Sequence, residues 1–247
     1  MAQQDAWLRR FHPTADSPVR LVCLPHAGGS ASYYHPLSAD LAARGIEALT
    51  VQYPGRQDRR TEPAAGSIAE LADGVTDALA GWSDLPLVLF GHSMGAVVAF
   101  ETAQRLARTG NPAVALLVSG RRGPTTSRTE PLVHQMSDDE VVAEIMSMDG
   151  TAGALLSDPD LLDLIMPAVR ADYRAIETYV VEDGALVHCP LTALVGDADP
   201  KATPEEARAW SVHTTGRFDM TVFAGGHFYL ADQRAAVVDT ILAEIGC

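Results

Sequence analysis

Short apolar runs recur along the chain, separated by amphipathic stretches and by turns rich in glycine, proline and aspartate. Runs of this kind, bounded by turn residues, are typical of strands that are buried inside a sheet. They predict strands over residues 19–24, 46–52, 87–90, 113–118, 191–195 and 218–223.

Between these runs, apolar residues return every three or four positions, as they do on the buried face of a helix. The clearest predicted helix, 67–80, opens with Ser67 and Glu70, which are spaced as a capping box. Other helices are expected over 33–43, 96–106, 203–212 and the C-terminal stretch that carries Val237, Val238, Ile241 and Ile245. Strands that alternate with helices predict an α/β fold with a mostly parallel central sheet and helices on both faces.

This alternation stops between about residues 125 and 188. A second capping box, Ser137 with Glu140, predicts a helix that runs to about Met148, and a further helical stretch is expected over 160–181. Pro167 should kink that stretch. We therefore expect one α/β domain over residues 1–247, with a helical lid inserted over the ligand-binding edge of the sheet.

Four methionines fall inside the predicted lid: Met136, Met146, Met148 and Met166. Methionine adapts its shape to irregular apolar partners, which suits a pocket for varied acyl chains. The alternative is that each is an ordinary core residue of a helical layer.

The junction between the strand 87–90 and the next helix carries the sequence Gly91-His92-Ser93-Met94-Gly95. The pattern G-x-S-x-G at such a junction is typical of a nucleophile elbow, which lifts the serine hydroxyl above the sheet. The N–H of Met94, at the start of the helix, is expected to stabilise an oxyanion. The glycine-rich loop 25–30 should supply a second donor, the Ala27 N–H. A chance glycine-rich turn is the competing interpretation, which the flanking strand and helix disfavour.

A serine nucleophile requires a base and a carboxylate that orients the base. In α/β-hydrolases the acid and then the histidine follow the serine along the chain, and His227 lies just after the last predicted strand. Asp199 is the preferred acid, while Asp197 remains open and is expected to shape the turn. The remaining candidate bases fit this order or position less well: His26, His92, His188 and His213.

The composition suits a protein with one large core, because 47% of the 247 residues are hydrophobic. There is no long apolar run and no apolar signal core, so we expect a cytoplasmic protein. The net charge of −14 argues against general binding to nucleic acids or anionic membranes. The cysteines are widely spaced, which predicts free thiols and no metal site: Cys23, Cys189 and Cys247.

Arginines are nevertheless clustered, and such local groups could contact an acidic partner. The clusters are Arg9 and Arg10; Arg56, Arg59 and Arg60; and Arg121, Arg122 and Arg128. An ordinary solvated surface is the alternative.

Taken together, the motifs resemble those of the type II thioesterases, the stand-alone thioesterases of polyketide and nonribosomal peptide pathways. The matching segments cover most of the chain: PHAGGS at 25–30, YPGR at 53–56, GHSMGA at 91–96, SGRRGP at 119–124, GDADP at 196–200 and GGHFYL at 225–230.

The resemblance implies an α/β-hydrolase fold with a mobile lid and hydrolysis of acyl groups from the phosphopantetheine arm of carrier proteins. In that family the reaction clears stalled or misprimed acyl units, and the enzyme, expected to be a monomer, needs no cofactor of its own. Ser93, Asp199 and His227 fall on the family's triad positions, and Met94 and Ala27 on its oxyanion positions. Rival interpretations are a medium-chain fatty acyl thioesterase, a carboxylesterase or lipase, and a non-catalytic module with a hydrolase fold.

Overall fold

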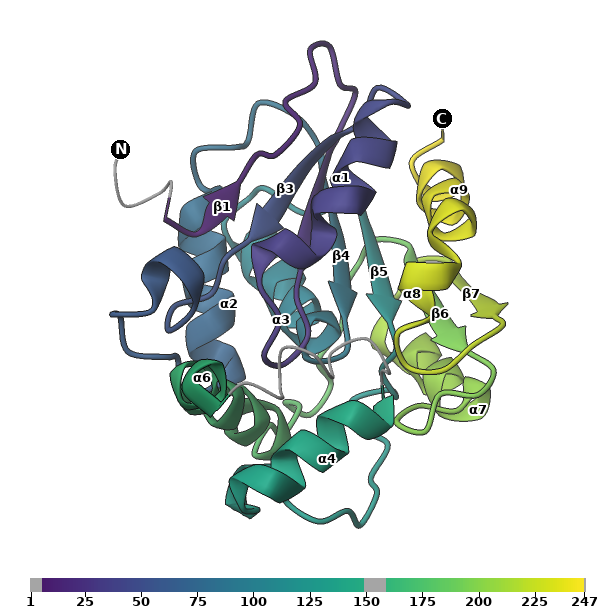
Figure 1. Ribbon diagram of the computed structural model, residues 1–247. Coiled ribbons are helices and arrows are strands. Elements are labelled where there is room, and N and C mark those ends of the chain that lie inside the picture. Colours follow the sequence, from purple (N-terminus) through teal and green to yellow (C-terminus); the bar gives the residue numbers. More distant parts are fainter. Residues whose placement is uncertain (1–5, 149–158, 247) are drawn as a thin grey trace.

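The computed structural model describes residues 6–148 and 159–246 of the chain. Its centre is a seven-stranded sheet in the order β1-β3-β2-β4-β5-β6-β7 (Figure 1). Every neighbouring pair is parallel except β1 with β3. The strands are β1 Leu8–Arg9, β2 Arg20–Leu24, β3 Glu47–Val51, β4 Leu87–His92, β5 Ala115–Ser119, β6 Leu191–Gly196 and β7 Phe218–Phe223.

Helices connect the strands in the alternation that the sequence predicts. The α-helices are α1 His35–Ala42, α2 Ile68–Leu79, α3 Met94–Arg108, α4 Asp138–Met148, α6 Pro159–Glu177, α7 Pro204–Arg208, α8 Tyr229–Asp232 and α9 Arg234–Glu244. Short 3-10 helices lie at Ala31–Tyr34, Gln57–Arg59, Val133–Gln135 and Ala209–His213.

The sheet separates two apolar cores, which confirms the prediction of helices on both faces. Side chains of β4 alternate between them: Leu87 and Leu89 pack with α2 and α3, whereas Val88 and Phe90 pack with α1 and α9. This alternation follows from the two-residue period of a strand. Because both faces are covered, the edge at the carboxyl ends of the strands is where a site can open.

The differences from the predicted elements lie at short or terminal pieces. The sequence does not predict β1, because two residues on an edge carry too little pattern to be recognised. The helix expected over 203–212 is α-helical only to Arg208 and then tightens into a 3-10 turn. The helix expected over 160–181 ends at Glu177 and passes through Pro167.

The two predicted capping boxes differ in one bond. At Ser137 both bonds form: its N–H donates to Glu140 Oε2 at 2.8 Å, and the Glu140 N–H donates to Ser137 Oγ at 3.4 Å. At Ser67 the hydroxyl accepts from the Glu70 N–H at 3.2 Å, but Glu70 accepts from the Gly66 N–H instead. Both serines still mark helix starts.

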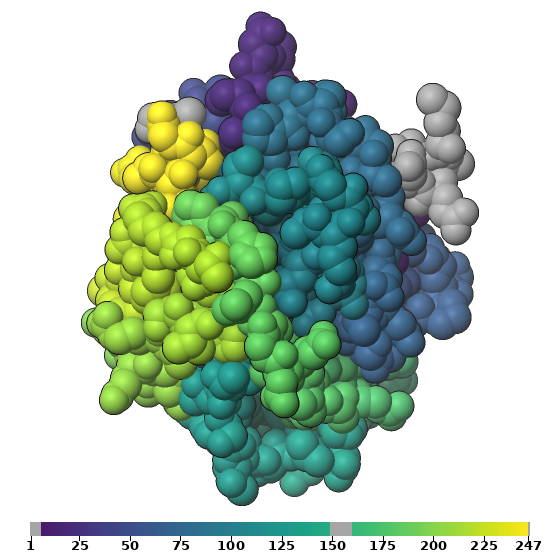
Figure 2. Space-filling view, turned by 180° about the vertical axis from the view of Figure 1, so that it is seen from behind, coloured from purple at the N-terminus to yellow at the C-terminus, as the bar shows by residue number. Residues whose placement is uncertain are grey.

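Helices α4 and α6 lie across the carboxyl ends of the strands, at the lower end of the molecule in Figure 1. Seen from behind, teal and green atoms of this segment close the same end (Figure 2). The segment has a small core of its own, formed by Val133, Val141, Met166 and Val169. Residues 149–158 of the expected lid and the predicted free thiol of Cys247 lie outside the described residues.

In the ranges 6–148 and 159–246, no helix combines the length and the apolar character that crossing a membrane requires.

Candidate active site

The turn between β4 and α3 holds Ser93 in a strained conformation, with φ of 55° and ψ of −117°. Its two flanking glycines are required by close backbone contacts. A Cβ on Gly91 would lie 2.0 Å from Gly95 O, and a Cβ on Gly95 would lie 2.1 Å from Leu24 O. Left-handed φ at a non-glycine residue persists only where the surroundings enforce it, and such residues cluster at active sites. The geometry is that of a nucleophile elbow.

Two backbone N–H groups lie where the sequence predicts oxyanion donors. Met94 is buried and is the first residue of α3, so its N–H has no acceptor within the helix. Ala27 lies in the loop after β2, which reverses through a hydrogen bond from the Gly29 N–H to His26 O at 2.9 Å. Within the described residues, the Ala27 N–H donates to no protein acceptor, whereas the next N–H, that of Gly28, donates to Asp172 Oδ2 at 2.8 Å.

His227 and Asp199 come together as a buried pair at the ends of β7 and β6. Nδ1 of His227 lies 2.9 Å from Asp199 Oδ2 and 3.0 Å from Oδ1. The two side chains are 2% and 0% exposed. A carboxylate on Nδ1 fixes that nitrogen as the protonated one, which leaves Nε2 to accept a proton.

The neighbouring acid, Asp197, has a different role. Its side chain is exposed, and Oδ1 accepts from the Gly225 N–H at 2.9 Å. It therefore ties the turn after β6 to the loop that leads to His227, as the sequence analysis expects. The structure places Asp199, and not Asp197, on the histidine.

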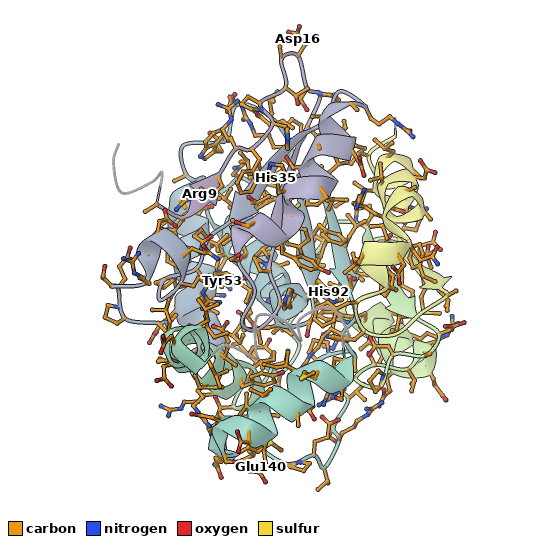
Figure 3. All side chains as sticks on the ribbon, in the orientation of Figure 1. Arg9, Asp16, His35, Tyr53, His92 and Glu140 are labelled. Carbon is orange, nitrogen blue, oxygen red and sulfur yellow. The ribbon has the colours of Figure 1, made fainter. Side chains whose placement is uncertain are left out.

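Ser93 and His227 lie at the same edge of the sheet. The Ser93 N–H donates to Ser119 O at 2.8 Å, and the ring of His92, the preceding residue, lies 4.9 Å from that of His227. In Figure 3 His92 and Tyr53 are labelled near the middle of the molecule, between Asp16 at one end and Glu140 at the other. Within residues 6–148 and 159–246 the Ser93 hydroxyl makes no direct hydrogen bond to the imidazole, and such bonds are often long in unliganded enzymes.

The other histidines take structural positions. His213 Nδ1 lies 3.1 Å from Ala185 O, and its ring contacts Phe100 and Trp210. His188 is exposed beside Thr215. The ring of His26 packs against Tyr33 and Phe228.

The four lid methionines do not share one environment. Met166 is buried in the core of the α4–α6 segment, and Met136 packs against that core. Met146 is 45% exposed, and Met148 is half-buried. Met166 therefore has the packing of an ordinary core residue. Acyl binding by the four methionines stays a prediction.

His92 is a buried histidine that the sequence analysis sets aside as the base. Its Nδ1 lies 2.9 Å from Ser119 Oγ, which lies 2.6 Å from the Tyr229 hydroxyl. Burial lowers the pKa of His92 well below its ordinary value of 6.5, and the neighbouring rings of His227 and His26 lower it further. A neutral His92 adds no positive charge beside the candidate base.

The depressed pKa of His92 predicts how stability depends on pH. Below pH 6.5 the unfolded chain binds a proton at His92 that the folded protein does not bind, so stability falls as the pH falls. This group contributes a slope approaching about 1.4 kcal/mol per pH unit. In urea unfolding between pH 7.5 and 5.5, we expect His92→Asn to lose stability less steeply than the parent protein. His188→Asn controls for removal of an exposed histidine, and equal slopes for all three proteins would contradict the prediction.

Comparisons with known proteins find a matching family model and similar relatives. Residues 19–245 match the family model described as thioesterase domain. The chain is 51% identical over 238 residues to the probable cadicidin biosynthesis thioesterase of Streptomyces griseus, with 96% of this chain and 65% of the relative covered. It is 52% identical over 229 residues to thioesterase PikA5 of Streptomyces venezuelae, with 92% and 81% covered. The chain thus spans less than two thirds of the first of these relatives.

A solved structure extends the similarity to the fold. The type II thioesterase BorB from the borrelidin biosynthetic cluster superposes with a TM-score of 0.90 at 49% identity, and the match covers 97% of this chain and 98% of BorB. The α/β-hydrolase architecture predicted from the sequence is therefore confirmed.

Proposed function

Because the chain belongs to the thioesterase domain family, we propose that it hydrolyses acyl thioesters through an acyl-enzyme formed on Ser93. The observation that carries this proposal is the strained Ser93 elbow at the same sheet edge as the buried His227–Asp199 pair. The relatives named for biosynthesis or as a type II thioesterase support a role in editing, in which aberrant or stalled acyl groups are removed from carrier proteins.

The proposed reaction has two halves. Ser93 Oγ attacks the thioester carbonyl carbon while His227 Nε2 takes the hydroxyl proton, and the N–H groups of Met94 and Ala27 stabilise the oxyanion. The C–S bond then breaks, and the leaving thiolate takes the proton from His227. Water, activated by the same nitrogen, attacks the acyl-enzyme, which releases the acid and restores Ser93. The thiolate leaves readily, so a serine triad supplies the groups that this chemistry needs.

The partner proposed for this reaction is an acyl or peptidyl carrier protein that presents its substrate on a phosphopantetheine arm. The clustered arginines offer less free positive charge to such a partner than the sequence suggests, because most of them face acids. The pairs are Arg9 with Asp58, Arg10 with Glu47, Arg56 with Asp172, Arg59 with Glu62, Arg122 with Glu130, and Arg128 with Glu206. Docking that depends on these clusters therefore has few unpaired arginines to use.

A series of acylated carrier proteins tests the substrate class. Acetyl, propionyl, butyryl, octanoyl and dodecanoyl groups are loaded on a holo carrier protein and compared with the matched N-acetylcysteamine thioesters. We expect kcat/KM to be at least about tenfold higher on the carrier protein, with activity spread over the short acyl groups, because remote binding energy is used at the reacting carbonyl.

The rival functions predict other outcomes in the same assay. A strict preference for the octanoyl and dodecanoyl groups would favour a medium-chain thioesterase. Equal kcat/KM with and without the carrier, together with faster hydrolysis of simple esters, would favour a carboxylesterase.

A further inference from the structure

The loop that carries the Ala27 N–H is bound to helix α6 by a buried ion pair. Arg56, in the turn after β3, donates from Nη2 to Asp172 Oδ1 at 2.8 Å and from Nη1 to Asp172 Oδ2 at 2.5 Å. The Arg56 side chain is 7% exposed and the Asp172 side chain is fully buried. The pair joins two segments that lie 116 residues apart in the sequence.

Both members of the pair also bind the loop itself. Asp172 Oδ2 accepts from the Gly28 N–H at 2.8 Å, and Arg56 Nη1 donates to Gly29 O at 3.1 Å. Gly28 has a φ of +74°, and a Cβ there would lie 3.1 Å from Val169 Cγ2, one turn before Asp172 on α6. The loop is thus held on the C-terminal side of Ala27 by charge-assisted hydrogen bonds and by close packing on α6.

These bonds select which N–H faces the site. The Gly28 N–H is used by Asp172, whereas within the described residues the Ala27 N–H is left without a protein acceptor. A buried ion pair adds little net stability compared with well-packed apolar side chains, so stability alone does not explain it. A bidentate pair does fix orientation, because both partners are planar and their two bonds define one geometry.

We propose that Arg56 and Asp172 are positioning residues that aim the Ala27 N–H at the oxyanion and make its position depend on the docking of α6. This inference rests on the proposed acyl transfer at Ser93. If α6 moves away, the Asp172 carboxylate leaves both the Gly28 N–H and the Arg56 guanidinium, so the loop loses its bond to α6 and Arg56 loses the partner that fixes it. The oxyanion hole is then complete only while α6 is in place.

Asp172→Asn tests this proposal with a nearly isosteric change. The amide cannot accept both bonds from Arg56 and turns an N–H toward the guanidinium, so the loop shifts. With butyryl-N-acetylcysteamine as substrate, we expect kcat to fall about 10- to 100-fold while KM stays within about threefold, because small misplacements of an oxyanion donor cost this much. The affinity of a butyl trifluoromethyl ketone, which forms a tetrahedral adduct on the serine, should fall by a similar factor.

The chain offers a matched control in a second ion pair made by α6. Arg170 of α6 pairs with Asp138 of α4, but Asp138 is 52% exposed and neither side chain is bonded to the loop. Asp138→Asn should keep the parent kcat and the parent affinity for the ketone. Equal losses in Asp138→Asn and Asp172→Asn would overturn the proposal, since they would trace the effect to the helical layer in general.

A double variant separates positioning from stability. Arg56→Met with Asp172→Leu removes both charges, and such replacements often restore the stability that a single change loses. We expect its melting temperature to recover relative to Asp172→Leu while kcat stays low, because the charge-assisted bonds to Gly28 and Gly29 are then absent. If kcat recovers together with the melting temperature, the pair is only structural. Labelling of Ser93 by a fluorophosphonate tests the proposed function separately, because it reports the nucleophile and not the position of the loop.

Discussion

Replacing Ser93 with alanine is expected to reduce kcat for thioester hydrolysis by a factor on the order of 10⁶, the loss seen when other serine triads lose their nucleophile. The alanine keeps the elbow backbone, in which residue 93 has a φ of 55° between β4 and α3. It removes only the oxygen that forms the acyl-enzyme. Binding and the two oxyanion donors remain, so a small residual rate above the uncatalysed reaction should persist.

Two measurements check this result. Single-turnover hydrolysis of an acylated carrier protein gives the rate, and mass spectrometry of the fluorophosphonate-treated protein gives the labelled residue. The parent protein should carry one adduct, on Ser93, and the alanine variant none. An adduct on another residue of the variant, with hydrolysis retained, would show that Ser93 is not the nucleophile.

A matched control is available in the same part of the fold. Ser119, at the end of β5, is also a buried serine at this sheet edge, and its hydroxyl bonds to His92 and Tyr229. Ser119→Ala should leave the fluorophosphonate adduct on Ser93. This comparison separates loss of the nucleophile from loss of any hydroxyl at this edge.

The sequence predicts the parts of the site that depend on local patterns. The elbow is recognisable because Gly91 and Gly95 are demanded by backbone contacts within one strand-to-helix junction. His227 can be inferred because it follows the last strand of an alternating α/β chain, and all such strand ends meet at one edge. These inferences need only the order of the elements and short-range geometry.

The features that sequence reasoning missed depend on contacts between distant segments. From the sequence, Arg56 is only one member of an arginine cluster. Its acidic partner, Asp172, lies 116 residues away along the chain. A signal for Asp172 does exist, since it lies on the buried face of α6 with Ala168, Val169, Ala175 and Ile176. A carboxylate on the apolar face of a helix requires a partner, but the pattern cannot say which one.

The sequence favours Asp199 without excluding Asp197, for a related reason. Asp197 and Asp199 lie in one turn after β6, and composition does not tell which side chain points inward. In the structure the Ala198 N–H donates a hydrogen bond to Gly225 O at 3.0 Å, which ties this turn to the loop after β7. With the turn held in this way, Asp197 is exposed and Asp199 is buried against His227. Tertiary contact with the loop after β7 decides between them.

Replacing Asp199 with asparagine is therefore expected to lower kcat by about 10⁴-fold, as in serine enzymes whose orienting carboxylate becomes an amide. The asparagine amide can donate to Nδ1 of His227, which moves the imidazole proton to Nε2. In that tautomer His227 cannot accept the proton of Ser93. Since the histidine and aspartate side chains are 2% and 0% exposed, water cannot readily replace the lost carboxylate.

The comparison with Asp197→Asn makes this prediction specific. An asparagine at 197 can still accept the Gly225 N–H bond through its carbonyl oxygen, so kcat should stay within about tenfold of the parent value. The rate of fluorophosphonate labelling should follow the same order, because it also requires His227 to take the Ser93 proton. A larger loss at 197 than at 199 would mean that the exposed acid is the one that orients the histidine.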